Sequence, residues 1–236
     1  MPTPRQGYRN AAGEKVPSVT TILGRFKDSG GLIKWAYSQG RKHENLAMRN
    51  LPAPAHLYDT VQEAALAGTI AHDFIESYIL DHAQEGERFA EAKAKYAGEA
   101  ADVKTRAWNA YQQFLKWLSN TNIRITHTEM GQVSEAHQFG GTLDAVGLDA
   151  DGNVVLIDWK TSNAVYGEYL TQLAAYAILL EEKNPALTPR GFHLLRVAKE
   201  SADFAHHYYG ELEREKRAFL LMRELYGIVY AIEKRA

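Results

Sequence analysis

Cysteine is absent from the 236 residues of this chain. Disulfides, thiolate catalysis, zinc–thiolate sites and iron–sulfur clusters are therefore excluded. Apolar runs long enough to span a membrane are absent as well, and the N-terminus, MPTPRQGYRN, lacks the apolar core of a signal peptide. These absences predict a cytoplasmic protein that does not enter a membrane.

A strong net charge is also missing. The formal net charge is −2, although 24% of the residues are charged. The chain as a whole has no excess of positive charge that would indicate a nucleic-acid partner. A local basic groove is still compatible with this net charge, because acids elsewhere in the chain offset it. With 45% hydrophobic residues the chain can bury a core as one domain, residues 1–236. We expect a helical part at 1–120, a sheet core at 121–210 and a C-terminal helix at 211–236.

The spacing of apolar residues predicts the order of the elements. A hairpin is expected at 7–17, Ser18 caps a short helix, and Pro52 and Pro54 end a helix at 32–49. Helical periodicity covers 59–82 and 86–119. Strands are then expected at 123–134, 139–149, 153–161, 190–197 and 203–209, with helices at 165–182 and 211–235. Gly140 and Gly141 are expected to interrupt the entry to the second strand. This order predicts an α/β or α+β fold with one mixed central sheet flanked by helices.

A pair of opposite charges ends the third expected strand, which begins with the apolar run Val154–Ile157. Such a run is typical of a central strand buried on both faces. Because side chains alternate along a strand, Asp158 and Lys160 point to one face and Trp159 points to the other. Two charges at the end of a buried strand are costly unless they are paired or used. The alternative is an exposed ion pair at the strand end.

A second carboxylate is expected beside this pair. Asp151 and Gly152 form a turn signal, which makes the flanking strands antiparallel and places Asp144 within one residue of the position opposite Asp158. Two neighbouring carboxylates raise each other's pKa, and a bound divalent cation removes that penalty. Oxygen ligands suit Mg²⁺ or Mn²⁺. Lys160 could then orient or deprotonate a water on that ion, which is a workable set for phosphodiester hydrolysis.

These residues resemble the motifs of a known family. Asp144 followed by Asp158-Trp159-Lys160 is similar to the D…(D/E)-x-K motif of the PD-(D/E)XK nucleases. The segments from Gly68 to His72 and from Gln172 to Tyr176 resemble the G-x-x-x-H and Q-x-x-x-Y motifs of the RecB-type exonuclease branch. All pieces occur in the family's order. The front end, at 17–23 and 32–36, also resembles phage-encoded and mitochondrial genome-maintenance exonucleases that lack an iron–sulfur cluster.

The resemblance implies a restriction-endonuclease-like fold and a role for each motif residue. The implied metal ligands are His72, Asp144, Asp158 and the backbone carbonyl of Trp159. Lys160 would position the nucleophilic water and stabilise the transition state. Gln172 and Tyr176, one helical turn apart, would line the site and contact the scissile strand or the lysine.

Two further acids carry open alternatives. Glu129, on the first expected strand, stands where many members of the family have an extra acid, and it either reaches a second metal or water or has no part in the site. Glu76, one turn after His72, either orients that imidazole or is solvated.

The resemblance implies a DNA exonuclease that uses Mg²⁺ or Mn²⁺ in recombination, repair or processing. Its partners would be single-stranded DNA or a duplex end, and a recombination or single-strand-binding protein. We expect the helical front to roof the site and favour chain ends. Some of a set of cations should meet phosphates: Arg41, Lys42, Lys93, Lys95, Lys104, Arg106, Lys183, Arg190, Arg196 and Lys199. A structure-specific or restriction-like endonuclease and an inactive nucleic-acid-binding module remain as alternatives, and the oligomeric state stays open.

Overall fold

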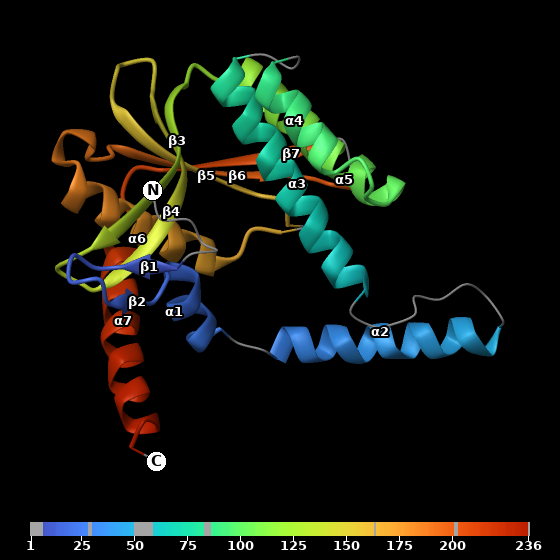
Figure 1. The fold of residues 1–236 in the computed structure, drawn as a ribbon, viewed down its shortest axis with the longest axis horizontal. Helices are drawn as coiled ribbons and strands as arrows, with labels where there is room; N and C mark the ends of the chain where they lie inside the picture. Colours follow the sequence, from blue (N-terminus) through green and yellow to red (C-terminus); the bar gives the residue numbers. More distant parts are fainter. Residues whose placement is uncertain are drawn as a thin grey trace.

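A mixed sheet forms the centre of the computed structural model, which describes residues 7–27, 30–49, 59–82, 86–162, 164–200 and 203–235. Its five strands lie side by side in chain order (Figure 1): β3 (Arg124–Ser134), β4 (Phe139–Leu148), β5 (Val154–Lys160), β6 (Gly191–Val197) and β7 (Phe204–Tyr209). Only β5 and β6 pair in parallel. A parallel pair needs a long crossover, which α6 (Gly167–Lys183) supplies. The predicted fold class is confirmed.

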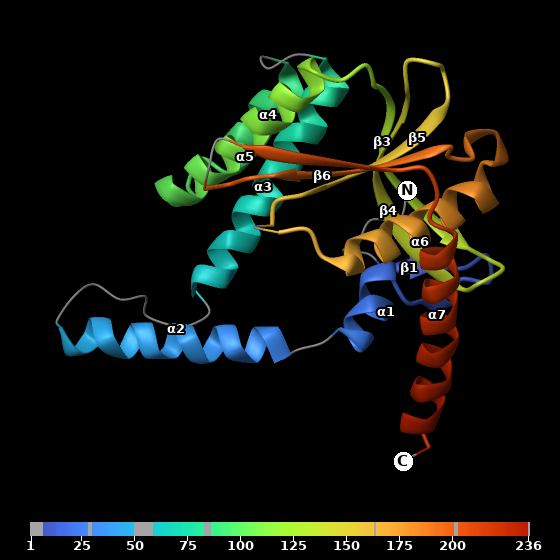
Figure 2. The ribbon, with the colours of Figure 1, turned by 180° about the vertical axis from the view of Figure 1, so that it is seen from behind.

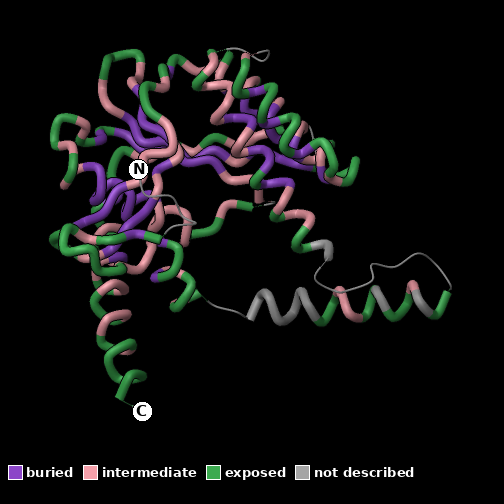
Figure 3. The backbone as a smooth tube through the Cα atoms, viewed as in Figure 1, coloured by how far each residue is buried: buried purple, intermediate pink, exposed green. Residues whose placement is uncertain are grey.

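Helices cover both faces of this sheet (Figures 1 and 2). One face carries α3 (Asp59–Asp81), α4 (Glu87–Lys95) and α5 (Ala101–Ser119), and the other carries α1 (Val19–Phe26), α6 and α7 (Glu213–Glu233). Alternation along β5 divides its side chains between the two cores. Ile157 and Trp159 pack with the α3–α5 helices, and Leu156 packs with α6. The buried residues accordingly concentrate in the sheet and on the helix faces against it (Figure 3).

The N-terminal hairpin lies against β4. Its strands are β1 (Tyr8–Arg9) and β2 (Lys15–Val16), and the Tyr8 hydroxyl is 2.8 Å from the Thr142 hydroxyl. Ser18 then caps α1 by accepting a hydrogen bond from the Thr21 amide at 2.9 Å. Both the hairpin and the cap were predicted correctly.

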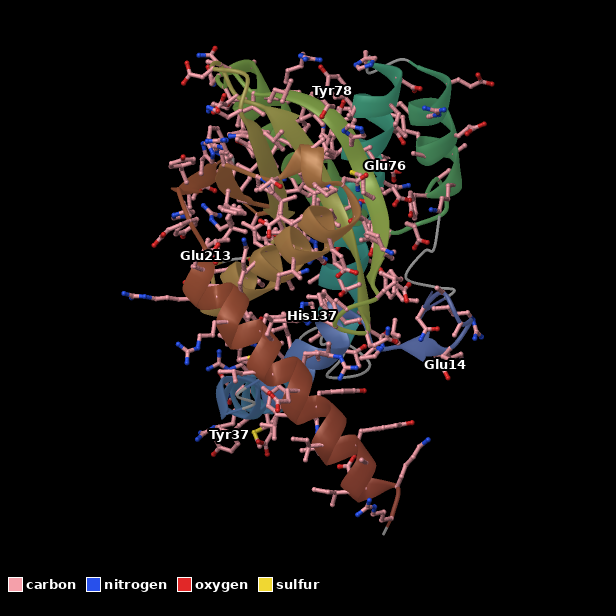
Figure 4. All side chains as sticks on the ribbon, turned by 90° about the vertical axis from the view of Figure 1, so that its left-hand side faces the viewer. Glu14, Tyr37, Glu76, Tyr78, His137 and Glu213 are labelled. Atoms are coloured by element: carbon pink, nitrogen blue, oxygen red, sulfur yellow. The ribbon has the colours of Figure 1, made fainter. Side chains whose placement is uncertain are left out.

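Helix α2 (Gly30–Met48) lies apart from the sheet in both ribbon views. Tyr37 on this helix is 69% exposed (Figure 4). The helix itself was predicted, but the prolines expected to end it lie outside the described residues. None of the helices in the described part of the chain is long and apolar enough to cross a membrane.

Two local predictions need correction. The continuous helix expected at 86–119 is two helices, α4 and α5, separated by a turn around Gly98. Gly140 and Gly141 were expected to interrupt the second strand, yet both lie within β4. A Cβ atom on Gly140 would lie 2.3 Å from the Tyr8 ring, and one on Gly141 would lie 2.8 Å from the Tyr176 ring. These glycines therefore admit aromatic rings against the strand instead of breaking it.

Candidate active site

Asp144 stands where the β4–β5 ladder ends. The last backbone pair is Ala145 with Ile157, so the next position along the hairpin sets Asp144 opposite Asp158. There the Asp144 Oδ2 atom accepts a hydrogen bond from the Trp159 backbone N–H at 2.9 Å. The carboxylate thus takes the place of a strand partner, which fixes its position at the end of β5. The predicted antiparallel arrangement is confirmed.

Asp158 and Lys160 form an ion pair next to it. Asp158 is fully buried, so the alternative of an exposed pair at the strand end is wrong. The Lys160 Nζ donates a hydrogen bond to Oδ1 of Asp158 at 2.9 Å. Oδ2 lies 2.7 Å from the same nitrogen, but without hydrogen-bond geometry, so it has no hydrogen-bond partner among the described residues. A buried carboxylate oxygen that accepts no hydrogen bond is a candidate cation ligand.

A second group consists of His72, Glu129 and Asp144, whose ligand atoms all lie within 4.8 Å of one another. His72 reaches this group from helix α3, which packs on the face of β5 to which Trp159 points. Its close approach depends on Gly68, one turn earlier, because a Cβ there would lie 2.7 Å from the Thr161 Oγ1 atom. In the G-x-x-x-H segment, the glycine therefore allows α3 to lie close to the end of β5, and the histidine supplies a side chain to the site.

Glu129 has an unusual backbone. In the β3–β4 ladder it stands between the pairs Thr128–Ala145 and Met130–Leu143, which sets it opposite Asp144. Its φ of 48° lies in the left-handed region, which costs a non-glycine residue about 1–3 kcal/mol. Such strain is commonly stored at functional sites, and here it coincides with an acid of the metal-ligand group.

Burial and mutual repulsion shift the pKa values of these groups. Burial, and then Asp144, raise the pKa of Glu129 to about 8. Burial also raises the pKa of Asp158 to about 7, against the opposing effect of Lys160. Burial raises the pKa of Asp144 too. Burial and the Lys160 charge lower the pKa of His72 to about 4, so this imidazole is neutral at pH 7 and has a lone pair for a metal.

The ammonium keeps its charge despite the burial. Burial lowers the pKa of Lys160, but Asp158 and Asp144 outweigh it and raise the value above its ordinary range. Its Nζ also lies 5.3 Å from the centre of the Tyr169 ring.

Helix α6 adds two polar side chains to the same region. The Gln172 Nε2 atom donates a hydrogen bond to the Tyr176 hydroxyl at 2.6 Å. Burial raises the pKa of Tyr176 well above its ordinary value, and the charges of Asp158 and Asp144 add to this effect. Tyr176 therefore remains protonated and close to both carboxylates. The four motif segments that are dispersed along the sequence converge at this end of the sheet.

Residues 41–227 match the family model of the PD-(D/E)XK nuclease superfamily. The chain belongs to this superfamily. No curated protein matches it. Among solved structures, it resembles the alkaline exonuclease LHK-Exo from Laribacter hongkongensis with 15% identity and a TM-score of 0.36, over 70% of this chain and 96% of that one.

Two further structures show a comparable likeness. LHK-Exo in complex with dAMP is 14% identical over 73% of this chain and 95% of that one, with a TM-score of 0.36. The protein SSO0001 is 16% identical over 66% and 71% of the two chains, with a TM-score of 0.34. These superpositions are loose, and the family assignment rests on the sequence match alone.

The donor atoms at the candidate site of this member of the PD-(D/E)XK nuclease superfamily suit a divalent metal. Carboxylate oxygens and a neutral imidazole are ligands for Mn²⁺, and carboxylates are the usual protein ligands of Mg²⁺. Of the two alternatives for Glu129, the structure favours a part in the site, because its carboxylate belongs to the same group as His72 and Asp144. Asp158 is not part of that group of three, and both of its oxygens lie within 3 Å of the Lys160 Nζ atom.

One contact at the site has no counterpart in the sequence motifs. The Trp159 Nε1 atom donates a hydrogen bond to the His72 Nδ1 atom at 3.1 Å. The hydrogen bond to His72 therefore comes from Trp159 and not from Glu76, which extends from α3 in Figure 4. Alternation identifies Trp159 only as a core residue, and no local signal indicates that its ring edge reaches α3.

Several cations considered for DNA contacts have internal partners instead. The pairs are Lys95 with Asp73 at 2.6 Å, Arg106 with Asp102 at 2.8 Å and Arg196 with Asp203 at 2.9 Å. Lys199 is buried and donates a hydrogen bond to the Ala64 carbonyl at 2.8 Å. A phosphate could bind at these positions only by displacing an existing contact, so these cations are less suited to contact DNA.

Proposed function

We propose that this protein is a DNA exonuclease that depends on Mg²⁺ or Mn²⁺ and hydrolyses phosphodiester bonds. One observation carries the proposal: the ligand atoms of His72, Glu129 and Asp144 lie within 4.8 Å of one another. Beside them stands the buried pair of Asp158 and Lys160. Ligands for a cation and a fixed positive charge are thereby combined at one place.

The residues that would hold the metal ion are His72, Glu129, Asp144, Asp158 through its Oδ2 atom, which accepts no hydrogen bond from the described residues, and the backbone carbonyl of Trp159. A divalent ion held there would supply Lewis acidity, which polarises the phosphate and makes water more acidic. The raised pKa values of Glu129 and Asp158 support this assignment, because a cation is what allows both carboxylates to ionise near neutral pH.

The remaining side chains would act on the phosphate. Lys160 is charged and held in position by Asp158, so it can orient the attacking water and stabilise the charge that develops on the phosphate oxygens. The Tyr176 hydroxyl accepts a hydrogen bond from Gln172, which leaves its own proton free to donate. We assign that proton to a phosphate oxygen of the scissile strand.

The preference for chain ends is the finer part of the proposal. It rests on the expectation that the helical front restricts access to the site. Helix α3 belongs to this front and contributes His72 to the site. The substrate would be single-stranded DNA or a duplex end during recombination, repair or processing. A recombination or single-strand-binding protein is the partner we expect to deliver it.

The test is a cleavage assay on end-labelled linear single-stranded DNA, linear duplex DNA and closed circles. Each substrate is incubated with Mg²⁺, with Mn²⁺ and with EDTA. Lys160→Met removes the proposed cation, and Lys116→Met is a matched control at an exposed position on α5. We expect loss of linear DNA only, dependent on the divalent ion, slowed by about 10²–10³ in Lys160→Met and retained in the control.

Other results would redirect the assignment. Equal cleavage of closed circles would replace the exonuclease with a structure-specific or restriction-like endonuclease. DNA binding without cleavage under every condition would indicate an inactive nucleic-acid-binding module. Cleavage at the wild-type rate in Lys160→Met would remove this site from the mechanism.

A further inference from the structure

The contact between Trp159 and His72 has a defined direction. An indole N–H is only a donor, so the His72 Nδ1 atom, 3.1 Å away, must accept with its lone pair. A neutral imidazole has one such nitrogen and one N–H. The hydrogen bond therefore places the imidazole proton on Nε2 and occupies the one nitrogen that has a lone pair in this tautomer.

A metal ligated by His72 conflicts with this arrangement, whichever nitrogen it uses. Ligation through Nδ1 takes the lone pair that the indole N–H uses. Ligation through Nε2 requires the proton to leave Nε2 and protonate Nδ1, so that two N–H groups face each other. In both cases the Trp159 N–H loses its acceptor.

The indole has little freedom to find another acceptor. Trp159 is fully buried, and its ring meets Phe114 edge-on with the ring centres 5.4 Å apart. The backbone N–H of the same residue is bound to Asp144, another member of the metal-ligand group. Water cannot replace the lost partner without opening this core, so the N–H would be left unsatisfied.

We propose that Trp159 is a positioning residue that holds His72 through its indole N–H and competes with the divalent metal for that imidazole. This inference rests on the proposed metal dependence and extends it. Trp159 fixes the ring of His72 beside Glu129 and Asp144 and, by the same hydrogen bond, weakens metal affinity. Because metal binding breaks the hydrogen bond between Trp159 on β5 and His72 on α3, occupation of the metal site is coupled to the contact between these two elements.

Metal affinity in a double-mutant cycle tests the proposal. Mn²⁺ binding is measured by isothermal titration calorimetry on the full chain for wild type, Trp159→Phe, His72→Ala and the double variant. Phenylalanine keeps an aromatic ring but removes the donor. We expect Trp159→Phe to bind Mn²⁺ about tenfold more tightly, which corresponds to about 1.4 kcal/mol. In the His72→Ala background the same substitution should have no effect.

Trp117→Phe is the matched control. This indole is almost fully buried in the same core, and its Nε1 atom has no hydrogen-bond partner among the described residues. Its loss should leave Mn²⁺ affinity unchanged. Equal or weaker Mn²⁺ binding by Trp159→Phe, or the same gain in the His72→Ala background, would overturn the proposal.

A second measurement needs no altered protein for its readout. The indole N–H resonance of Trp159 is identified in a ¹⁵N spectrum by its absence from Trp159→Phe and followed while Mg²⁺ is added to wild type. We expect it to move toward the position of an indole that is not hydrogen-bonded. A resonance that stays in place while Mg²⁺ saturates the site would contradict the competition. Absence of any divalent binding by wild type would overturn the proposed function as well, whereas binding without this coupling would overturn only the role of Trp159.

Discussion

Two groups of charges meet at the end of β4 and β5, and they are compensated in different ways. Asp158 and Lys160 are opposite charges in direct contact, and the pair is buried with the fold. Glu129 and Asp144 share their space with His72, which is neutral at pH 7. The first group contains its own cation, Lys160. The second has no cation in direct contact among the described residues, and we propose that a divalent metal completes it.

Removing Lys160 should have the largest effect, because it takes the cation away from the first group. Lys160→Met leaves Asp158 buried without its partner, which typically costs about 3–5 kcal/mol of stability. It should also lower the rate of DNA cleavage by about 10²–10³ through the lost transition-state charge. Urea unfolding and single-turnover cleavage measure the two effects separately.

A double variant separates fold from chemistry at this pair. Asp158→Asn combined with Lys160→Met removes both charges and should recover most of the lost stability without recovering cleavage. Recovery of cleavage in the double variant would mean that the pair serves only the fold.

The second group should reveal itself through pH. The folded-state pKa of Glu129 is raised to about 8, so the folded protein retains a proton that the unfolded chain has lost, and stability falls as pH rises toward 8. His72, with its lowered pKa, has the opposite effect only between about pH 4 and 6.5. From pH 6.5 to 8 without metal, Glu129 should cost up to about 2 kcal/mol.

Urea unfolding at several pH values in EDTA checks this dependence. Glu129→Gln should remove most of the decline between pH 6.5 and 8 and leave the smaller one that Asp158 causes through its folded-state pKa of about 7, and saturating Mg²⁺ should flatten the decline in wild type. A decline of the same slope in Glu129→Gln would show that burial and the neighbouring carboxylates do not raise the pKa of Glu129.

Gly68 tests how the two groups are brought together. The Cβ of Gly68→Ala would lie 2.7 Å from the Thr161 Oγ1 atom, so the Thr161 side chain or α3 must shift, and a shift of α3 would carry His72 with it. The overpacking cost of about 1–3 kcal/mol should exceed the helix-propensity gain of about 1 kcal/mol. Mn²⁺ affinity should fall as well, by calorimetry.

Gly24→Ala is the control, because no atom lies within 4 Å of its added Cβ in α1, and it should not destabilise the protein. Thr161→Ala removes the opposing hydroxyl and should restore part of the loss in Gly68→Ala. Unchanged Mn²⁺ affinity in Gly68→Ala would mean that His72 does not depend on this approach.

The smallest effect is expected at Tyr176. Tyr176→Phe removes the hydroxyl that accepts from Gln172 and is proposed to donate to the phosphate. At about 1 kcal/mol for such a hydrogen bond, cleavage should slow by about three- to tenfold with unchanged Mn²⁺ affinity. Tyr230→Phe, at an exposed position on α7, is the control for cleavage. A change in metal affinity would instead place Tyr176 in the metal-ligand group.

The sheet was predictable because its signals are local. Alternation and the turn at Asp151 and Gly152 located β4 and β5, and the register that follows set Asp144 opposite Asp158. Gly140 and Gly141 were misinterpreted because their neighbours, Tyr8 and Tyr176, are distant in sequence. A glycine that admits a ring cannot be distinguished locally from one that ends a strand.

The site was predictable as a set of residues but not as a set of contacts. Motif spacing identified His72, Asp144, Asp158 and Lys160. Whether Glu129 joined them depended on a left-handed backbone conformation in the middle of a strand, for which its sequence gives no signal. The hydrogen bond from Trp159 to His72 depends on the packing of α3 against the sheet, which only the folded chain determines.

The most direct test of the central claim is Mn²⁺ binding by wild type and Asp144→Asn, measured by isothermal titration calorimetry. Glu224→Gln, which alters an exposed acid on α7, is the control. The account predicts that wild type and the control bind Mn²⁺ and that Asp144→Asn loses at least tenfold in affinity. Failure of wild type to bind, or equal binding by Asp144→Asn, would contradict the assignment of a divalent metal to the group of His72, Glu129 and Asp144.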